Sequence, residues 1–494
     1  MVTMKKEWID HVHDILEELR QACGDYSKIA GDTDPEYKLH SPFLHPTMSS
    51  TKILNFNLPL PVDPKSHTKN PSGFTAGTGF RLSWWPQVQT VDRMVSSWRW
   101  AILERRRLEK IVLKFQQDLL KLKEMLPLML VELQIQNNAH EVGTFQRLIN
   151  HDDSDQLGLA SHARLQQLIA SPTVNADNYD LGNLQIEASE GTLAPVLGQI
   201  SRSRWHTHGK EKVLVEYKEF EPTKDPSVIG EQKRRVQQLA NLLSLAGSND
   251  LQTLRPKGYV YQEKYNRFVF IFDFPQNVVH EAPMTLNTLL LQGNRTSRLS
   301  LPERFKIAEI LARTVGTFHA DGWVHKSIRS HSILFFHDTH KGEVCASLPY
   351  LANFEFSRPE TAETNFTYDA DTEKNLYRHP DRQGPPKTCF SKLHDIYALG
   401  VVLLEIGLWQ SALVIYEEAG KMLKPGVKPN SRGIQKIFIH IASRELSLYM
   451  GPAYKDAVLA CLSDEFKDLT SHASFPHLFY EKIITGVNGN SLFK

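Results

Sequence analysis

The chain has 494 residues, 41% of them hydrophobic, which is enough for two or three globular domains. The 57 lysines and arginines almost balance the 56 aspartates and glutamates, so the net charge of +1 offers no global positive field for nucleic acid. The 4 cysteines form neither a dense framework nor a C-x-x-C pair, and we therefore expect a cytoplasmic protein. Apolar runs stay far below the ~20 residues that a membrane-spanning helix needs, so no transmembrane segment is expected.

The region over residues 1–176 is predicted to be an α-helical bundle. Apolar residues recur at helical spacing between Lys6 and Cys23 and predict a short amphipathic helix. Repeated prolines among serine, threonine and glycine predict a loop or linker over residues 41–79. A long bundle helix is predicted within residues 88–126, with the apolar stripe Leu108, Ile111, Phe115, Leu119, Leu122 and Leu126. Acidic residues interleave with its basic ones, which favours a core stripe over a helix that binds membrane or nucleic acid.

Residues 177–190 are a predicted connector, and residues 190–475 a predicted α+β domain. Alternating apolar residues predict one strand over Val213–Tyr217, next to Lys218, and another over Phe268–Phe272. Helical spacing predicts a helix over residues 231–243. It also predicts a helix over Leu301–Ala320, whose second residue is a proline that suits a first turn.

Two short motifs in this domain resemble the active centre of a protein kinase with its functional groups exchanged. The chain reads HKSIRSHS at residues 325–332 and NFE at residues 353–355. A kinase has H-R-D-L-x-x-x-N and D-F-G there: the first Asp accepts the substrate proton, and the Asn and the second Asp hold magnesium. The corresponding residues here are Ser327, Ser332 and Asn353. None is a carboxylate, so we expect no intact catalytic residue and no bound Mg²⁺.

Three further motifs follow the kinase order. The strand that ends at Lys218 resembles V-A-I-K, Tyr377–Asp381 stands in the place of A-P-E, and Asp395 to Gly400 resembles the start of the large central helix. Five motifs in this order predict a bilobal protein-kinase-like fold. The resemblance gives His325, Asp395 and Gly400 structural roles, because in kinases the matching His and Asp brace the backbone of the catalytic loop.

The expected nucleotide site is incomplete. The glycine-rich loop falls on residues 197–202, where Gly198 is the only glycine, and side chains there would crowd the phosphates. Arg235 stands where a kinase has the Glu that pairs with the strand Lys, although Glu231, one turn earlier, could substitute. Weak ATP binding remains compatible with the sequence. Its candidate contacts are Lys218, Gly198, Arg329 and Asp273, the last in the predicted hinge over residues 273–275.

The segment Trp98–Val112, together with residues 213–220 and 325–336, resembles a family of fungal proteins. That family joins a HeLo-type (prion-inhibition and propagation) helical domain to a degenerate protein-kinase-like domain, and the resemblance covers most of residues 88–465. HeLo bundles are associated with cell-death signalling in which an apolar N-terminal helix enters membranes. The first helix here departs from that pattern with Asp10, Asp14, Glu17 and Glu18. These charges count against membrane insertion by this helix.

Three functions follow from these observations. The first is a pseudokinase that acts as a signalling scaffold or switch and contacts other signalling proteins through its helical region. The second is an active atypical protein kinase that uses Lys218 and Arg329 with a different acid, for which Asp338, Glu343, Glu355 and Glu360 are candidates. The third is a membrane-acting cell-death effector gated by the pseudokinase.

Overall fold

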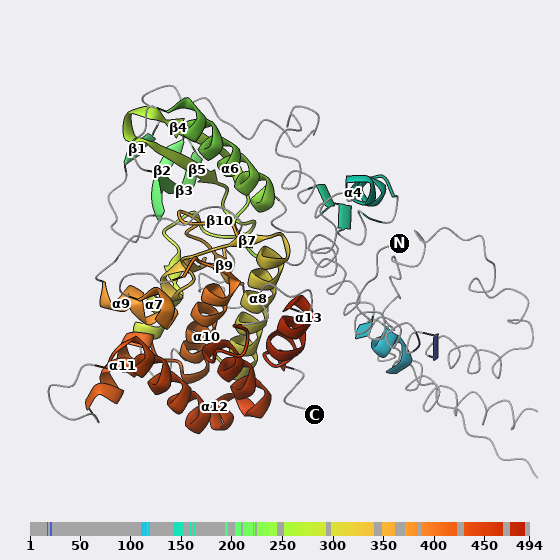
Figure 1. The fold of residues 1–494 in the computed structure, drawn as a ribbon, viewed down its shortest axis with the longest axis vertical. Helices are drawn as coiled ribbons and strands as arrows, with labels where there is room; N and C mark the ends of the chain where they lie inside the picture. Colours follow the sequence, from blue (N-terminus) through green and yellow to red (C-terminus); the bar gives the residue numbers. More distant parts are fainter. Residues whose placement is uncertain are drawn as a thin grey trace, which may run out of the picture. The chain divides into compact units, whose positions relative to one another are not determined.

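A computed structural model describes the following residues: 17, 20–21, 110–115, 117–118, 142–151, 154, 159–160, 163–164, 193–195, 203–208, 211–220, 222, 225–244, 251–292, 298–339, 348–360, 371–383, 388–421, 429–467 and 475–489 (Figure 1). The predicted loop over residues 41–79, the connector over residues 177–190 and the loop over residues 197–202 lie outside them. The two predicted N-terminal helices are described only in part.

Most of the described residues of the N-terminal region are helical. Glu17, Arg20 and Gln21 lie in a helix, and the Arg20 guanidinium pairs with the Glu17 carboxylate three residues earlier. Residues 110–115 and 117–118 are also helical, and helix α4 spans Val142–Ile149. The chain divides into two compact units, residues 9–122 and residues 1–8 with 123–494. All the elements described below belong to the second unit.

The first part of the α+β region is a five-stranded antiparallel sheet with one helix against it (Figure 1). The strand order is β1-β2-β3-β5-β4. The bounds are β1 Leu193–Pro195, β2 Ser203–His208, β3 Glu211–Glu219, β4 Pro256–Gln262 and β5 Arg267–Phe272. Helix α6, Pro226–Ser244, buries its apolar side chains in one cluster with Leu214 of β3 and Phe270 of β5.

Alternation along β3 decides what each face of the sheet carries. Val213, Val215 and Tyr217 belong to a small apolar cluster on one face, together with side chains of β4 and β5. Successive side chains of a strand point to opposite faces, so Glu216 and Lys218 share the α6 face with Leu214. Two charged side chains are thereby directed toward the interior of the protein.

Several short elements lie within residues 263–382, the first of them between β4 and β5. They are η5 Glu263–Tyr265, β6 Met284–Thr285, α7 Leu286–Leu291, β7 Trp323–Val324, η6 Ser330–Ser332, β8 Ile333–Phe335, β9 Tyr350–Leu351, β10 Arg358–Pro359, α9 Thr372–Leu376 and η7 Pro380–Arg382. Strand β8 lies between β6 and β9 in a three-stranded sheet, and β7 pairs with β10. The segments around residues 325–332 and 353–355 are therefore adjacent in space.

Helix α8, Leu301–Ala320, has the bounds that the sequence predicts. It begins with a capping box, in which the Ser300 backbone N–H donates to the Glu303 carboxylate at 2.8 Å, and Pro302 lies in its first turn. Ser300 and Glu303 satisfy groups that helix formation leaves without partners. Local residues thus account for where this helix starts.

Helix α10, Lys392–Leu408, is buried along its whole length and packs against α8 and α12 (Figure 1). A Cβ atom on Gly400 would lie 2.6 Å from the Cβ of Cys461 on α12, so only glycine allows the two helices to approach this closely. Helix α12, Ser431–Leu462, kinks at Gly451, whose φ is 81°, immediately before Pro452. Helix α11, Ala412–Lys421, lies between α10 and α12 in the chain.

The C-terminal elements are α13, Phe475–Phe479, and η8, Tyr480–Ile484. The Phe479 and Ile484 side chains lie close to Gly316 of α8, so the packed core continues beyond residue 475. The described residues as a whole combine antiparallel sheets with a larger set of helices, an α+β arrangement. Among them, no single helix is both long and apolar enough to cross a membrane; α10 and α11 meet those two criteria only as a pair bent by 78°.

Candidate functional site

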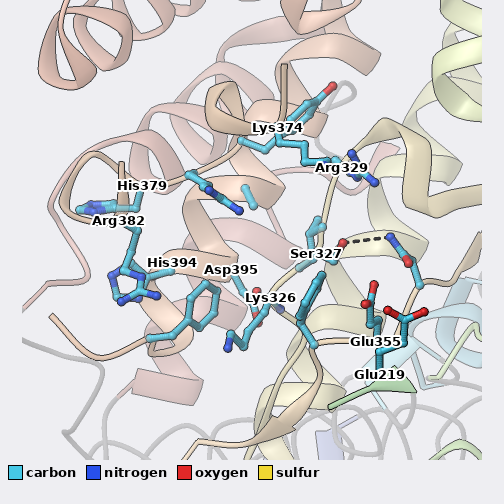
Figure 2. A pocket seen from close by; sticks show the side chains of 17 residues that line it. Glu219, Lys326, Ser327, Arg329, Glu355, Lys374, His379, Arg382, His394 and Asp395 are labelled. Carbon is cyan, nitrogen blue, oxygen red and sulfur yellow. Dashed lines mark hydrogen bonds between the residues drawn. The ribbon is translucent and has the colours of Figure 1, made fainter. Parts of the chain in front are cut away.

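The three exchanged residues of the predicted active centre lie together and bond to one another. The Asn353 side-chain amide donates to the Ser327 hydroxyl at 3.0 Å (Figure 2). The Ser332 hydroxyl donates to the carbonyl oxygen of Ser327. Ser332 is fully buried, and Asn353 nearly so. The polar atoms at the positions of a kinase's base and metal ligands therefore satisfy one another.

Asn353 also has an unusual backbone. Its φ of 75° lies in the left-handed region, which asparagine tolerates better than most residues. The β3 residue Glu216 stabilises this conformation, because its carboxylate accepts hydrogen bonds from the backbone N–H of Asn353 at 2.7 Å and of Phe354 at 2.8 Å. Glu216 is only 3% exposed, and burial raises its pKa to about 7 although these two hydrogen bonds act in the opposite direction.

Lys218 is held on the same side of the site. Its ammonium group donates to the carbonyl oxygens of Glu355 at 2.6 Å and Ser357 at 2.9 Å. Burial lowers the pKa of Lys218 to about 7, and repulsion from Lys326 adds to this effect. The amine of β3 is thus engaged by backbone oxygens of the segment that follows Asn353.

Asp395 braces the loop that carries Ser327. Its fully buried carboxylate accepts from the backbone N–H of His325 at 2.6 Å and of Lys326 at 2.9 Å, and it lies 3.2 Å from the ring Nε2 of His319. Burial alone would raise the pKa of Asp395, but the hydrogen bond and charge of His319 bring it below the usual value. The loop therefore rests on a buried anion at the start of α10.

His325 supports the same loop from its other side. Its Nδ1 accepts from the Ser327 backbone N–H at 3.2 Å, and its carbonyl oxygen accepts from the Ser357 hydroxyl at 3.1 Å. Burial lowers the pKa of His325 to about 4, so the ring is neutral at physiological pH. His325 and Asp395 both contact loop backbone in this structure, as their predicted structural roles require.

A second buried network anchors the segment that contains α9 and η7. The Tyr377 hydroxyl donates to the Glu405 carboxylate at 2.6 Å, and the same carboxylate oxygen accepts from the Ser330 hydroxyl and from the backbone N–H of Ala412. Burial raises the pKa of Glu405 to about 8. At the end of the segment, Asp381 pairs with Arg432 of α12 at 2.8 Å.

The other predicted nucleotide contacts are Gly198, Asp273 and Arg329. Gly198 lies outside the described residues. Asp273 is exposed and lies 3.6 Å from the Lys257 ammonium. Glu231 does not replace the missing partner of Lys218, because its carboxylate binds the guanidinium groups of Arg234 and Arg235.

Arg329 lines a cavity of about 390 Å³ that Ser327 and Asn353 also line (Figure 2). The predicted catalytic loop, the start of α10 and the segment over residues 371–382 form its walls. Within the described ranges, no cluster of three or more His, Cys, Asp or Glu side chains is arranged to hold a metal ion.

No protein-family model matches the chain, and no curated protein shows significant sequence similarity to it.

Sequence reasoning missed Glu216. The signal was present, since a carboxylate in the middle of an otherwise apolar strand points to the same face as Lys218. A buried carboxylate needs donors, and the strand pattern does not identify them. The two backbone amides that it binds belong to residues 137 and 138 positions further along the chain.

Proposed function

We propose that residues 193–489 form a bilobal protein-kinase-like domain that acts as a signalling scaffold or switch and does not transfer phosphate. The strand order β1-β2-β3-β5-β4 with a single helix against the sheet supports this proposal, as does the presence of the kinase-like motifs on one continuous body. Two contacts support the proposal further. The loop that carries Ser327 lies next to Asn353, and Asp395 binds the backbone of that loop.

One observation carries the non-catalytic part of the proposal. Ser327, Ser332 and Asn353 form an internal hydrogen-bonded group in place of two carboxylates and a metal-binding amide. Phosphoryl transfer relies on positioning and on electrostatic stabilisation by metal ions, and a neutral self-satisfied group supplies neither. A metal or a substrate would have to compete with these partly buried hydrogen bonds.

ATP, which the resemblance implies, does not fit the residues around Lys218 well. The ammonium group that would contact phosphates already donates to two carbonyl oxygens, and the Glu216 carboxylate lies beside Asn353. A carboxylate at that place repels phosphate whenever it is ionised. We expect nucleotide binding to be weak at most, with little gain from Mg²⁺.

A transfer assay tests this proposal directly. The full-length protein, incubated with radiolabelled ATP, Mg²⁺ or Mn²⁺ and a general protein substrate, should transfer no phosphate above the background without enzyme. A Lys218→Ala variant should give the same result. Transfer by the wild-type protein that disappears in this variant would show that the domain is a kinase. Calorimetry with ATP, first in EDTA and then in excess Mg²⁺, measures separately how much the metal increases the affinity for ATP.

An active atypical kinase is the second candidate, and one observation favours it. Of the acids proposed as a replacement base, Glu355 lines the same cavity as Ser327, whereas Glu360 binds the Lys392 backbone N–H and ammonium group. If transfer is detected, Glu355→Gln should abolish it under this second hypothesis, and the paired control Glu360→Gln should not.

The role in signalling rests on the resemblance to fungal HeLo-type proteins. We propose that the helical region contacts other signalling proteins in the cytoplasm, in an incompatibility or cell-death pathway. The kinase-like domain would hold or regulate this helical region. Almost all of the N-terminal helix relevant to membrane insertion lies outside the described residues, and its acidic residues speak against the effector hypothesis.

A further inference from the structure

The cavity beside Ser327 is lined by cations from two separate segments of the chain (Figure 2). Lys326 and Arg329 come from the predicted catalytic loop. Lys374, Arg378 and Arg382 come from the segment that contains α9 and η7. We propose that this cavity binds a phosphate monoester. The proposal goes beyond the scaffold role and stands whether or not the domain is catalytic.

The charges around the cavity are unbalanced. Its lining contains five lysine or arginine side chains and three carboxylates, those of Glu219, Glu355 and Asp395. Asp395 is committed to the backbone amides behind the loop, and Lys374 pairs with the Asp371 carboxylate at 3.5 Å. The other four cations of the lining therefore face the carboxylates of Glu219 and Glu355. An anion in the cavity would reduce the repulsion between these cations.

The ionisation of the cationic side chains agrees with this imbalance. Burial lowers the pKa of Lys326 to about 8, and the positive charges of Arg358 and Arg382 lower it further than the Asp395 carboxylate can restore. Burial, together with the charge of Arg378, also lowers the pKa of Arg382. Positive charge is therefore crowded at one place, where a dianion would gain most.

Hydrogen bonds hold two of the cations in position. Arg382 donates to the Thr388 carbonyl oxygen at 2.6 Å, and Arg378 donates to the Asn375 side-chain oxygen at 3.2 Å. These hydrogen bonds orient the two guanidinium groups. Preorganised guanidinium groups bind planar or tetrahedral oxyanions through paired N–H donors.

The walls of the cavity favour an ester over inorganic phosphate. The Phe390 ring lies 5.5 Å from the Lys326 ammonium and 5.9 Å from the Arg382 guanidinium, and Phe356 and Tyr377 also line the space. A volume of about 390 Å³ is in the range that accommodates a small ligand. An organic group attached to the phosphate can therefore contact aromatic rings while its oxygens contact the cations. A phosphorylated protein side chain and a small phosphorylated metabolite share this chemistry.

Calorimetry on the full-length protein tests the proposal with phenyl phosphate as the probe. Arg378→Gln and Arg382→Gln should each raise the Kd at least tenfold. Arg444→Gln is the matched control, because it removes the same charge from an exposed position on α12 and should leave the Kd unchanged. Phenyl sulfate, a monoanion of similar shape, should bind more weakly. Equal affinity of all three variants for phenyl phosphate, or no binding by the wild-type protein, would overturn the proposal.

A footprinting experiment on the wild-type protein does not depend on how the variants fold. Lys326 should react with an acylating reagent, since its lowered pKa leaves more of the amine neutral. Saturating phenyl phosphate should reduce acylation of Lys326 at least fivefold and leave the exposed Lys306 and Lys436 unchanged. Unchanged labelling of Lys326 would contradict occupation of the cavity.

Two further probes distinguish the sources of the ligand. A phosphoserine peptide that binds more tightly than a sugar phosphate identifies a phosphorylated protein, and the reverse order identifies a small metabolite. Either order supports the site, and binding of neither overturns it.

Discussion

Replacing Asp395 by alanine should destabilise the domain strongly, even if the domain has no catalysis to lose. The carboxylate of Asp395 is fully buried and accepts from the backbone N–H groups of His325 and Lys326. Lys326 has a φ of 68°, a left-handed conformation that costs about 1–2 kcal/mol for a residue with a Cβ. The carboxylate thus stabilises a backbone that would otherwise relax.

The size of the effect follows from these contacts. A hydrogen bond to a charged group contributes about 1.5–3 kcal/mol, and removing the acceptor leaves two buried donors without it. The two lost hydrogen bonds together imply that Asp395→Ala lowers the free energy of unfolding by about 3–5 kcal/mol. Asp395→Asn keeps one acceptor oxygen but turns an NH2 donor toward the other backbone N–H, so it should also destabilise the domain.

Urea unfolding followed by tryptophan fluorescence measures this loss, because Trp323 is buried in the same part of the domain. Asp456→Ala is the matched control, since the Asp456 side chain is 66% exposed. The lowered pKa of Asp395 means that its stabilisation is complete above pH 3.8, its usual pKa, and is lost as the pH falls through the folded-state value. An unfolding midpoint of Asp395→Ala equal to that of Asp456→Ala would refute the reasoning.

Two further predictions concern buried positions outside this loop. A rise of the Glu216 pKa from 4.5 to about 7 corresponds to roughly 3 kcal/mol, a cost to the folded state that develops as the pH rises from 4.5 to 7. Glu216→Gln should remove this part of the pH dependence. The difference in unfolding free energy between wild type and variant should therefore change by about 2–3 kcal/mol between pH 5 and pH 8. A difference that stays constant with pH would contradict the burial argument. Gly400→Ala should destabilise by about 1–3 kcal/mol, because the new Cβ would meet Cys461 at 2.6 Å. Gly420→Ala is the control, because nothing lies within 4 Å of its new Cβ, and its melting temperature should equal or exceed that of the wild type. Equal melting temperatures for the two variants would contradict the close approach of α10 and α12.

The local sequence was sufficient for several elements. Alternation of apolar residues predicted β3 and β5 to within a few residues, and the helical stripe with its proline predicted α8 from Leu301 to Ala320. These elements follow from side-chain periodicity and from groups that satisfy the backbone at a helix start, and both are properties of neighbouring residues. The exchange of carboxylates for Ser327, Ser332 and Asn353 was likewise visible in the sequence alone.

Which polar atoms meet was decided by the tertiary structure. The sequence made Lys218 a candidate for an ATP contact or for a structural ion pair, and in the structure its ammonium group binds carbonyl oxygens 137 and 139 residues away. The hydrogen bonds of Glu216 depend on the left-handed backbone at Asn353. The cationic cavity needs both Lys326 and Arg382 next to the Phe390 ring, although these two cations are far apart in the chain. Periodicity determines which face of an element is buried, but the partner of a buried charge depends on the placement of distant backbone, to within a few tenths of an ångström.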